Sequence, residues 1–185
     1  MSQKLLKKHE VVIAGRNSGD LSVDITDVSS IKEMYEKTGK LDAVVCTAGE
    51  AKWDEFTNMT EKDFYIGIES KLMGQVNLVK EGLSYMNPEG SFTLTTGILG
   101  DDPVALTTSA AMVNGGINSF VKALDLELKN DIRINAISPG LVEDAAKKYE
   151  AYFPGHTPVS MQRTIDGYIK SIEGKISGQV IRIIS

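Results

Sequence analysis

Hydrophobic residues fall into six short runs along the chain, each of strand length and each bounded by polar or turn-forming residues. Continuous apolar runs of this length are typical of strands buried on both faces, as parallel sheets require. The predicted strands are Glu10–Ala14, Leu21–Val23, Leu41–Cys46, Ser91–Thr95, Ile132–Ile137 and Gln179–Ile184. The pattern therefore predicts a parallel sheet.

Between these runs, apolar residues recur at helical spacing. Asp27 can cap a helix that Gly39 can stop. The other expected helices follow a capping-box sequence at Thr60–Asp63, span Ser109–Leu128, and run from Ser160 to Gly174. Strands that alternate with helices at this spacing favour right-handed crossovers and an open, doubly wound α/β sheet.

The length of 185 residues is that of one domain, covering residues 1–185. Hydrophobic residues make up 42% and charged residues 24%, which is normal for a globular protein and excludes a disordered or fibrous chain. No apolar run approaches the length of a membrane span, and lysine-rich Met1–Glu10 has no hydrophobic stretch typical of a signal peptide. We therefore expect a cytoplasmic protein without membrane contacts.

The net charge of −5 is spread along the chain, which argues against a nucleic-acid partner. The short basic segment Lys4–Lys8 is interpreted as the solvated side of an N-terminal helix. The single Cys46 excludes a disulfide framework, and the two histidines, His9 and His156, are far apart in sequence. We therefore expect no metal site.

Ligands of open α/β sheets bind beyond the carboxyl ends of the strands, so the residues that follow each strand are the candidate site. Arg16 follows the first predicted strand, and its planar donor fork could face an adenosine 2′-phosphate or lie in a surface turn. Asp24 follows the second strand, where it could accept from an adenine amino group or cap the next helix.

Small residues and hydroxyls follow the next strands. Thr47, Ala48 and Gly49 would let a ligand approach the backbone closely. Thr96 offers a hydroxyl after the fourth strand, and Ser138–Gly140 forms a rigid turn after the fifth.

In this order, these residues resemble the short-chain dehydrogenase/reductase family of Rossmann-fold oxidoreductases. Gly15–Arg16 is similar to the end of the second strand in NADP-preferring members, and Asp24 to an adenine-contacting aspartate. The other similar segments are Thr47–Gly49 (the family's Asn-Ala-Gly, with threonine for asparagine), Arg133–Gly140 beside the nicotinamide, and Ile176–Val180 at the last strand.

The resemblance implies a Rossmann-like, three-layer α/β/α fold that binds NADP(H) and a small-molecule substrate. The cofactor-binding residues that it implies are Arg16, Asp24, Thr47, Ala48, Gly49, Pro139 and Gly140.

The chain departs from the family at its start, where it has no Gly-x-x-x-Gly-x-Gly turn. Met1–Lys8 aligns with the helix that follows this turn, so the usual first strand and phosphate loop are lacking. In the strand order 3-2-1-4-5-6 that strand is central. We consider three explanations: a start codon further upstream, a truncated chain, or neighbouring strands that close up or borrow a strand from another subunit.

The catalytic residues of the family are also replaced. Gly97, beside Thr96, stands at the serine position, and the Tyr-x-x-x-Lys motif falls on Ala110 and Asn114. The helix asparagine of the family falls on Lys71. Because alanine cannot transfer a proton, we do not expect the ordinary carbonyl–alcohol redox reaction.

Other groups could rebuild the site. The candidate catalytic residues are Thr96, Lys71, Ser109 and Asn114, with Thr95 as a further donor. Lys71 could act as an acid if burial lowers its pKa, or it could be a solvated helix lysine. The Ser109 hydroxyl is too weak an acid without an activating base. His156 could be an acid in the loop where the family covers its substrate, or an exposed loop residue.

Three functions remain open at this point. The protein could be an NADP(H)-linked oxidoreductase with an unusual proton donor, or a module that binds a nucleotide without turnover. It could instead be a scaffold that forms homodimers or homotetramers through the helices Lys71–Tyr85 and Ser109–Leu128.

Overall fold

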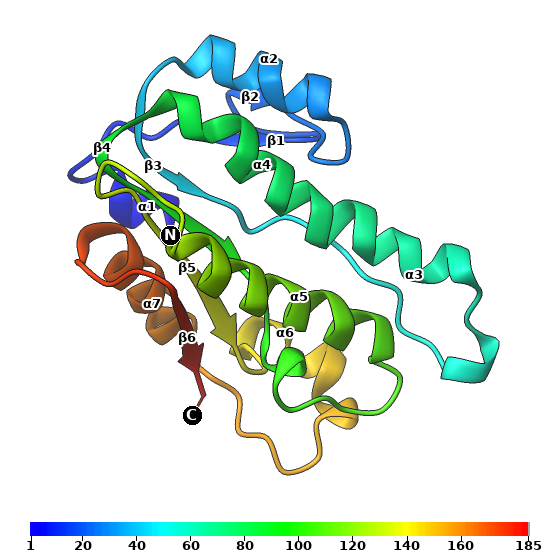
Figure 1. Cartoon of the computed structure of the whole chain (residues 1–185). Helices are drawn as coiled ribbons and strands as arrows, with labels where there is room; N and C mark the ends of the chain where they lie inside the picture. The colour runs from blue at the N-terminus through cyan, green and yellow to red at the C-terminus, as the bar shows by residue number, and fades with distance from the viewer. Residues whose placement is uncertain (185) are drawn as a thin grey trace.

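The computed structural model describes residues 1–184, in which strands and helices alternate and all strand pairs are parallel (Figure 1). The strands are β1 (Ala14–Gly15), β2 (Leu21–Ser22), β3 (Leu41–Val45), β4 (Met86–Thr95), β5 (Arg133–Pro139) and β6 (Gln179–Ile183). The prediction of a parallel α/β fold is confirmed.

Helices connect the strands. The α-helices are α1 (Ser2–Leu5), α2 (Val28–Thr38), α3 (Glu61–Gly67), α4 (Gly74–Gly82), α5 (Thr108–Asp125), α6 (Glu143–Tyr149) and α7 (Met161–Glu173). Short 3₁₀ turns are η1 (Phe56–Asn58), η3 (Leu83–Tyr85), η4 (Ile98–Gly100) and η5 (Glu150–Tyr152). The π-helical segment η2 (Ile68–Met73) joins α3 to α4, so that the three form one long helix with a widened middle.

The predicted helix ends are confirmed by their caps. Asp27 accepts a hydrogen bond from the Ser29 backbone N–H at the start of α2, and Gly39 ends that helix at a φ of 68°. The capping box between Thr60 and Asp63 is formed at the start of α3. Ser160 accepts from a backbone N–H in the first turn of α7. These ends are local in sequence, which is why the sequence predicts them well.

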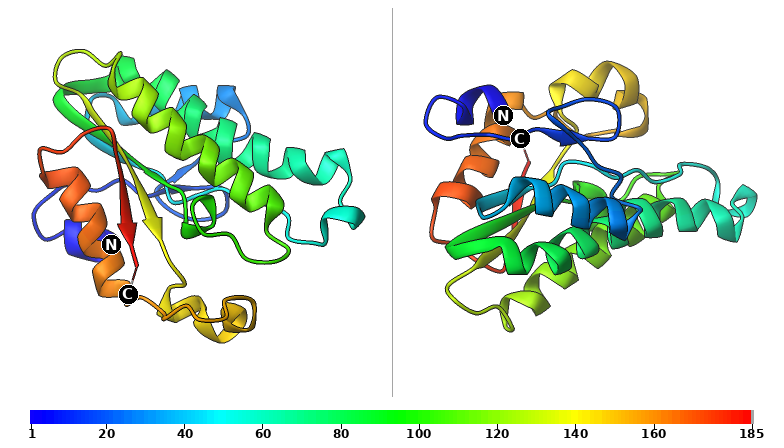
Figure 2. Two further views of the ribbon diagram at one scale, coloured as in Figure 1. Left: turned by 60° about the horizontal axis from the view of Figure 1, so that its bottom comes forward. Right: turned by 90° about the horizontal axis from the view of Figure 1, so that it is seen from above.

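The strands lie between two layers of helices. α4 and α5 cover one face, and α7 with α1 covers the other (Figures 1 and 2). Side chains of β4 alternate between these layers, because Phe92 packs in the core beneath α4 and α5 while Thr93 bonds to Ser171 of α7. The three-layer arrangement is that of the expected fold class.

The sheet is divided into two pieces. β3, β4, β5 and β6 form a four-stranded sheet in that order, and β1 pairs only with β2. Within residues 1–184, no ladder joins β1 to β3, so these two strands do not close up against each other.

The prediction of a strand over Glu10–Ala14 is wrong, because β1 contains only Ala14 and Gly15. Val12 and Ile13 are 45% and 44% exposed. A parallel strand buried on both faces needs a partner on each edge and cover on each face. The Ile13 carbonyl oxygen accepts from the backbone N–H groups of Asp20 and Leu21, but in the described chain Val12 and Ile13 belong to no strand ladder. Their apolar character alone therefore does not extend the strand.

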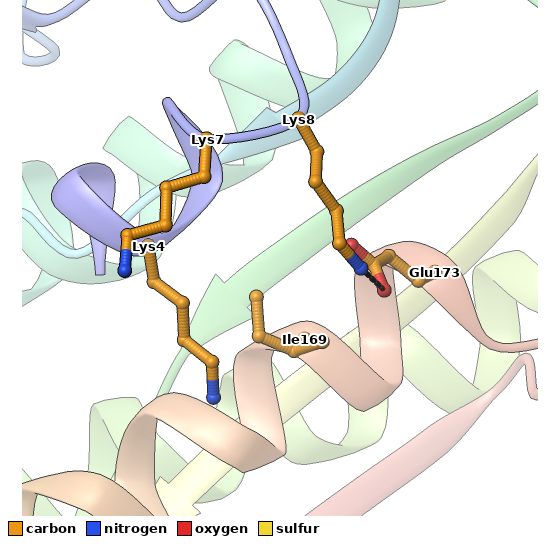
Figure 3. A pocket seen from close by; sticks show the side chains of 5 residues that line it. All are labelled: Lys4, Lys7, Lys8, Ile169 and Glu173. Carbon is orange, nitrogen blue, oxygen red and sulfur yellow. Dashed lines mark ion pairs between the residues drawn. The ribbon is translucent and has the colours of Figure 1, made fainter.

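The basic segment near the N-terminus lies against α7. Lys8 approaches Glu173 at 3.8 Å (Figure 3). Lys4 pairs with Asp166 at 2.6 Å. The helix expected over this segment ends at Leu5, so Lys7 and Lys8 lie beyond it. In the described part of the chain, no helix is long and apolar enough to cross a membrane.

Candidate functional site

The carboxyl ends of β3, β4 and β5 meet at one edge of the sheet. The register pairs Val45 with Thr93 and Thr95 with Ile137. The segments that follow these strands, Thr47–Gly49, Thr96–Gly97 and Gly140, are thereby brought to the same edge. Parallel pairing thus collects residues that are far apart in the sequence, as ligand sites in this fold class require.

Lys71 lies in the π-helical segment η2 and reaches the end of β4. Its Nζ lies 3.5 Å from the backbone carbonyl oxygen of Thr96. The side chain is partly buried, and desolvation lowers the pKa of its ammonium below the usual value for lysine. Among residues 1–184, no carboxylate lies within ion-pair distance of it. Lys71 is therefore not the solvated, ion-paired lysine of an ordinary helix surface.

Asn114 approaches the same strand end from α5. The Thr96 hydroxyl donates to the backbone carbonyl oxygen of Asn114 at 3.1 Å. A Cβ atom at Gly97 would lie 3.2 Å from Asn114 Nδ2, so the absence of a side chain at Gly97 leaves room for the amide. Asn114 is 4% exposed, and its Oδ1 has no hydrogen-bond partner among the described residues.

Ser109 lies in the first turn of α5, beside Gly67 at the end of α3. Its side chain is fully buried, its Oγ has no partner within the described chain, and a Cβ atom at Gly67 would lie 3.3 Å from that oxygen. Within the described chain, no base therefore contacts this hydroxyl. Ala110, at the family's tyrosine position, packs in an apolar cluster with Leu99 and Phe153.

Lys71, Thr96 and Asn114 thus come together, whereas Thr95 does not join them. The Thr95 hydroxyl donates to the Cys46 carbonyl oxygen and contacts the Tyr168 hydroxyl at 2.6 Å, on the face that α7 covers. The alternation of side chains along a strand places consecutive residues on opposite faces.

The loop after β3 passes directly over η2. Gly49 has a φ of 116°, and a Cβ atom there would lie 2.7 Å from the Cα atom of Lys71. Only glycine fits this contact without moving the helix. Cys46, just before the loop, is buried, and burial raises the pKa of its thiol, so it is a core residue and not a reactive nucleophile.

Arg16 and Asp24 form a second cluster beyond β1 and β2. Arg16 Nη2 donates to Asp24 Oδ1 at 3.0 Å, and the backbone N–H and hydroxyl of Thr26 donate to the same oxygen. These bonds from Thr26, and then from Arg16, hold the pKa of the Asp24 carboxyl below its usual value. Arg16 lines a surface hollow of about 280 Å³ formed by residues 15–22. Asp24 does not cap α2, because Asp27 does.

His156 belongs to an aromatic cluster that the sequence does not reveal. Its Nε2 lies 3.6 Å from Asp102, and its ring packs edge-on against Phe153. Trp53 contacts Phe153, Tyr149 and Tyr152, and so joins the loop after β3 to α6 and η5. His156 is therefore partly buried in the segment that covers this end of the fold. Only the high aromatic content of residues 149–153 could have indicated the cluster.

Two further buried oxygens near the site were not singled out from the sequence. Ser138 Oγ at the end of β5 and Asn118 Oδ1 on α5 have no hydrogen-bond partner among residues 1–184. A Cβ atom at Gly100 would lie 3.0 Å from Asn118 Nδ2, so η4 packs closely on α5. In the same part of the chain, no group of three or more histidine, cysteine or acidic residues could hold a metal ion.

Comparison with known proteins gives the family. The family model described as enoyl-(acyl carrier protein) reductase matches residues 2–168. Oxidoreductase UcpA of Escherichia coli K12 is 31% identical over 129 residues, which are 64% of this chain and 48% of UcpA. The 3-oxoacyl-[acyl-carrier-protein] reductase FabG of Thermotoga maritima is 29% identical over 128 residues, 65% of this chain and 52% of that protein. The chain spans about half the length of these curated relatives.

Solved structures agree with this assignment. The protein lin1944 from Listeria innocua is 43% identical, with a TM-score of 0.96 over 98% of this chain and 91% of that chain. A small-chain dehydrogenase in complex with NADPH is 29% identical, with a TM-score of 0.79 over 89% of this chain and 84% of that one. Together with the match over residues 2–168, these similarities show that the chain belongs to the short-chain dehydrogenase/reductase family.

Proposed function

We propose that this protein binds NADP(H) and that it does not use the tyrosine-dependent proton transfer of its family. The observation that carries the proposal is the Arg16–Asp24 pair at the ends of β1 and β2. These are the positions at which the family resemblance implies contacts with the adenosine half of the cofactor. The small-chain dehydrogenase that is 29% identical to this chain was solved in complex with NADPH.

The adenosine end of the cofactor fits the residues present. Arg16 uses one nitrogen for Asp24, is half-exposed and lines the hollow of residues 15–22, so further guanidinium donors are available to a 2′-phosphate. Asp24 stays ionised at neutral pH because its pKa is lowered, and a carboxylate accepts from an adenine amino group. Among residues 1–184 there is no counterpart of the family's glycine-rich phosphate turn.

The other end of the cofactor would lie across the carboxyl ends of β3 and β5. Thr47, Ala48 and Gly49 present backbone and small side chains there, and Pro139–Gly140 forms the turn after β5. The bound nicotinamide would supply or accept a hydride. Residues of this chain would exclude water and hold the proton. Because Ala110 has no proton to give, Lys71 is the candidate acid, with its proton held at Nζ and its pKa lowered by burial.

A second candidate function is binding without turnover. Ala110 packs against Leu99 and Phe153 at the position of the family's tyrosine, which favours a site that has lost this chemistry. Saturable, Lys71-dependent consumption of NADPH would support the oxidoreductase, whereas binding without turnover would support this second function.

The test of NADP(H) binding is a titration of the purified chain with NADPH and with NADH. Trp53, the one tryptophan of the chain, gives a fluorescence readout, and thermal unfolding gives an independent one. A ligand at 100 times its Kd stabilises the fold by about 2.7 kcal/mol. We expect Arg16→Ala to weaken NADPH binding about tenfold or more and to leave NADH binding nearly unchanged, because a charge-assisted contact is worth about 1.5–3 kcal/mol.

The matched control is Arg163→Ala, which removes an exposed arginine from the start of α7. This variant should bind both nucleotides as the parent chain does. The absence of any binding by the parent chain would contradict the proposal. An equal loss of NADPH affinity in the Arg16 and Arg163 variants would show that Arg16 does not contact the cofactor.

We also propose that the protein forms homodimers or homotetramers through α3, η2 and α5. Tyr65, Ile66 and Met73 on the long helix and Met112 on α5 are large hydrophobic residues that remain exposed. The long helix formed by α3 and η2 packs against α5, so the exposed residues of the two helices belong to neighbouring surfaces. An apolar patch of this kind is suited to an isologous interface with a second copy.

A further inference from the structure

Gln75 is a fully buried polar residue on α4, and its side chain contacts the carboxyl end of β4. Its Nε2 donates to the backbone carbonyl oxygen of Thr95 at 2.9 Å, and its Oε1 accepts from the Thr95 backbone N–H at 2.9 Å. One carboxamide thus pairs with both main-chain groups of a single residue. The side chain therefore makes the contacts that a neighbouring strand makes in a sheet.

The strand that these contacts replace is β3. In a parallel ladder, a residue bonds to two residues of the neighbouring strand that lie two positions apart. Thr93 follows this pattern, since its carbonyl oxygen accepts from the Cys46 N–H at 2.9 Å. The next bonds of the ladder would join the Thr95 N–H to the Cys46 carbonyl oxygen and the Ala48 N–H to the Thr95 carbonyl oxygen. Gln75 occupies both of these positions on Thr95.

The main chain after β3 consequently separates from β4. The Cys46 carbonyl oxygen stays satisfied, because it accepts from the Thr95 hydroxyl at 2.6 Å. Within residues 1–184, no backbone carbonyl oxygen accepts from the N–H groups of residues 47–49, and these residues are exposed. The following N–H, that of Glu50, donates to Ser70 Oγ of η2 at 3.2 Å. The segment therefore leaves β4 and follows η2.

We propose that Gln75 is a positioning residue that holds the carboxyl ends of β3 and β4 apart and so keeps the Ala48 N–H available to an acceptor oxygen of a bound nucleotide. Without the carboxamide, the buried main-chain groups of Thr95 would need other partners. The ladder would extend by one step, and the Thr95 carbonyl oxygen would take up the Ala48 N–H. This edge of the sheet is where ligands of the fold class bind.

The inference rests on the proposed function for the identity of the ligand, whereas the separation of the strands needs no nucleotide. Amide hydrogen exchange of the purified chain, resolved by NMR without nucleotide, reports whether the Ala48 N–H is paired. A titration with NADPH, followed through Trp53 fluorescence, reports the affinity. In the parent chain, we expect the Ala48 amide to exchange at close to the unprotected rate and the Thr95 amide at least about tenfold more slowly.

Gln75→Ala removes the carboxamide and leaves room for the strand ends to pair. The Ala48 amide should then exchange about tenfold more slowly than in the parent chain. The affinity for NADPH should fall about fivefold, because one hydrogen bond to the ligand is lost. Gln75→Asn has a shorter carboxamide that cannot reach both main-chain groups of Thr95. It should change both quantities in the same direction, and it replaces the alanine variant if that variant does not fold.

Leu78→Ala is the matched control, since Leu78 is buried in the main core on the same helix. This variant should destabilise the fold by leaving a cavity. It should nevertheless leave the Ala48 amide unprotected and the NADPH affinity nearly unchanged. Equal changes in the Gln75 and Leu78 variants would show that any loss of packing brings the strands together, and would overturn the positioning role.

The remaining outcomes separate the two proposals. Protection of the Ala48 amide in the parent chain overturns the role of Gln75, as does an Ala48 amide that stays unprotected in the Gln75 variants. If the Ala48 amide becomes protected while NADPH affinity is unchanged, this N–H does not contact the nucleotide, and the proposal is overturned in that respect. If the parent chain does not bind NADPH, the proposed function fails, while amide exchange still decides whether Gln75 holds the strands apart.

Discussion

Lys71 and Asn114 approach Thr96 from two different helices. The ammonium of Lys71 lies 3.5 Å from the Thr96 carbonyl oxygen, and the main-chain carbonyl oxygen of Asn114 lies 3.1 Å from the Thr96 hydroxyl. The family resemblance places an asparagine at position 71 and a lysine at position 114. The site therefore keeps one ammonium and one carboxamide, but on exchanged helices. Its positive charge lies on η2, whereas the resemblance places it on α5.

This exchange predicts coupling between the two positions. Asn114→Lys should destabilise the fold by about 3 kcal/mol or more, because it buries a second ammonium beside Lys71 without a counter-ion. Adding Lys71→Asn should recover about 0.5–3 kcal/mol of that loss beyond the sum of the single effects. Urea unfolding of the four proteins in the double-mutant cycle measures the coupling. Strictly additive changes would show that the two side chains do not interact.

The partly buried ammonium of Lys71 predicts a pH dependence of stability. Burial lowers its pKa in the folded state below the usual 10.5 of lysine, so the unfolded chain binds more protons between the folded and unfolded pKa values. The contribution of Lys71 to the free energy of unfolding therefore increases as the pH rises through that window. Lys71→Met should be more stable than the parent chain at pH 7, and the difference should shrink toward pH 10.5.

Urea unfolding of both proteins from pH 7 to pH 10.5 checks this expectation. Lys122→Met is the control, because its lysine is exposed, and its stability difference from the parent should stay constant with pH. A constant difference for Lys71→Met as well would mean that Lys71 is hydrated in the folded protein.

Restoring tyrosine at position 110 should not restore the family's chemistry. Ala110 is buried against Ile98, Leu141 and Phe153, so Ala110→Tyr should cost about 1–3 kcal/mol by overpacking. Position 114 would still lack the lysine that lowers the pKa of the family's tyrosine. Met112→Tyr, at an exposed position of the same helix, should be nearly neutral. Thermal unfolding measures the cost. Carbonyl-dependent NADPH oxidation that Ala110→Tyr shows and the parent chain does not would refute the expectation.

The proposed self-association predicts that a substitution of Met112, which is 46% exposed, changes the oligomeric state. Met112→Glu should convert the oligomer into monomer, because two copies of the new charge would meet near the two-fold axis of an isologous contact. The stability of the monomer should change by less than about 0.5 kcal/mol. Light scattering coupled to size-exclusion chromatography gives the molar mass. An unchanged mass would exclude this face as the interface.

Elements with local signals were predictable from the sequence. The starts of α2, α3 and α7 follow from caps that need only the next three residues, and β3, β5 and β6 follow from their apolar runs. β4 begins at Met86, earlier than the apolar run Ser91–Thr95 predicts. The extent of β1 could not be predicted in this way. Its apolar run is correctly identified, but a parallel strand forms only where partners lie on its edges.

The candidate site was predictable in part for a similar reason. Lys71, Thr96 and Asn114 could be brought together by counting along the strands and helices, because parallel strand ends meet at one edge of the sheet. The widened turn at η2 and the packing of Trp53 on Phe153 have no local signal. Both depend on how separate segments fit in space, which a pattern along the chain does not contain.

The pairing of β3 on one side only has a consequence for aggregation of the protein on heating. Within residues 1–184, β4 and β5 have a strand on each side, whereas the outer row of peptide groups on β3 has no partner strand. Such an edge can take up a strand from another chain. Amide exchange should therefore be faster along the outer edges of β3 and β6 than in β4 and β5. Edge-to-edge pairing at these outer strands would be the route to aggregation as the protein is heated.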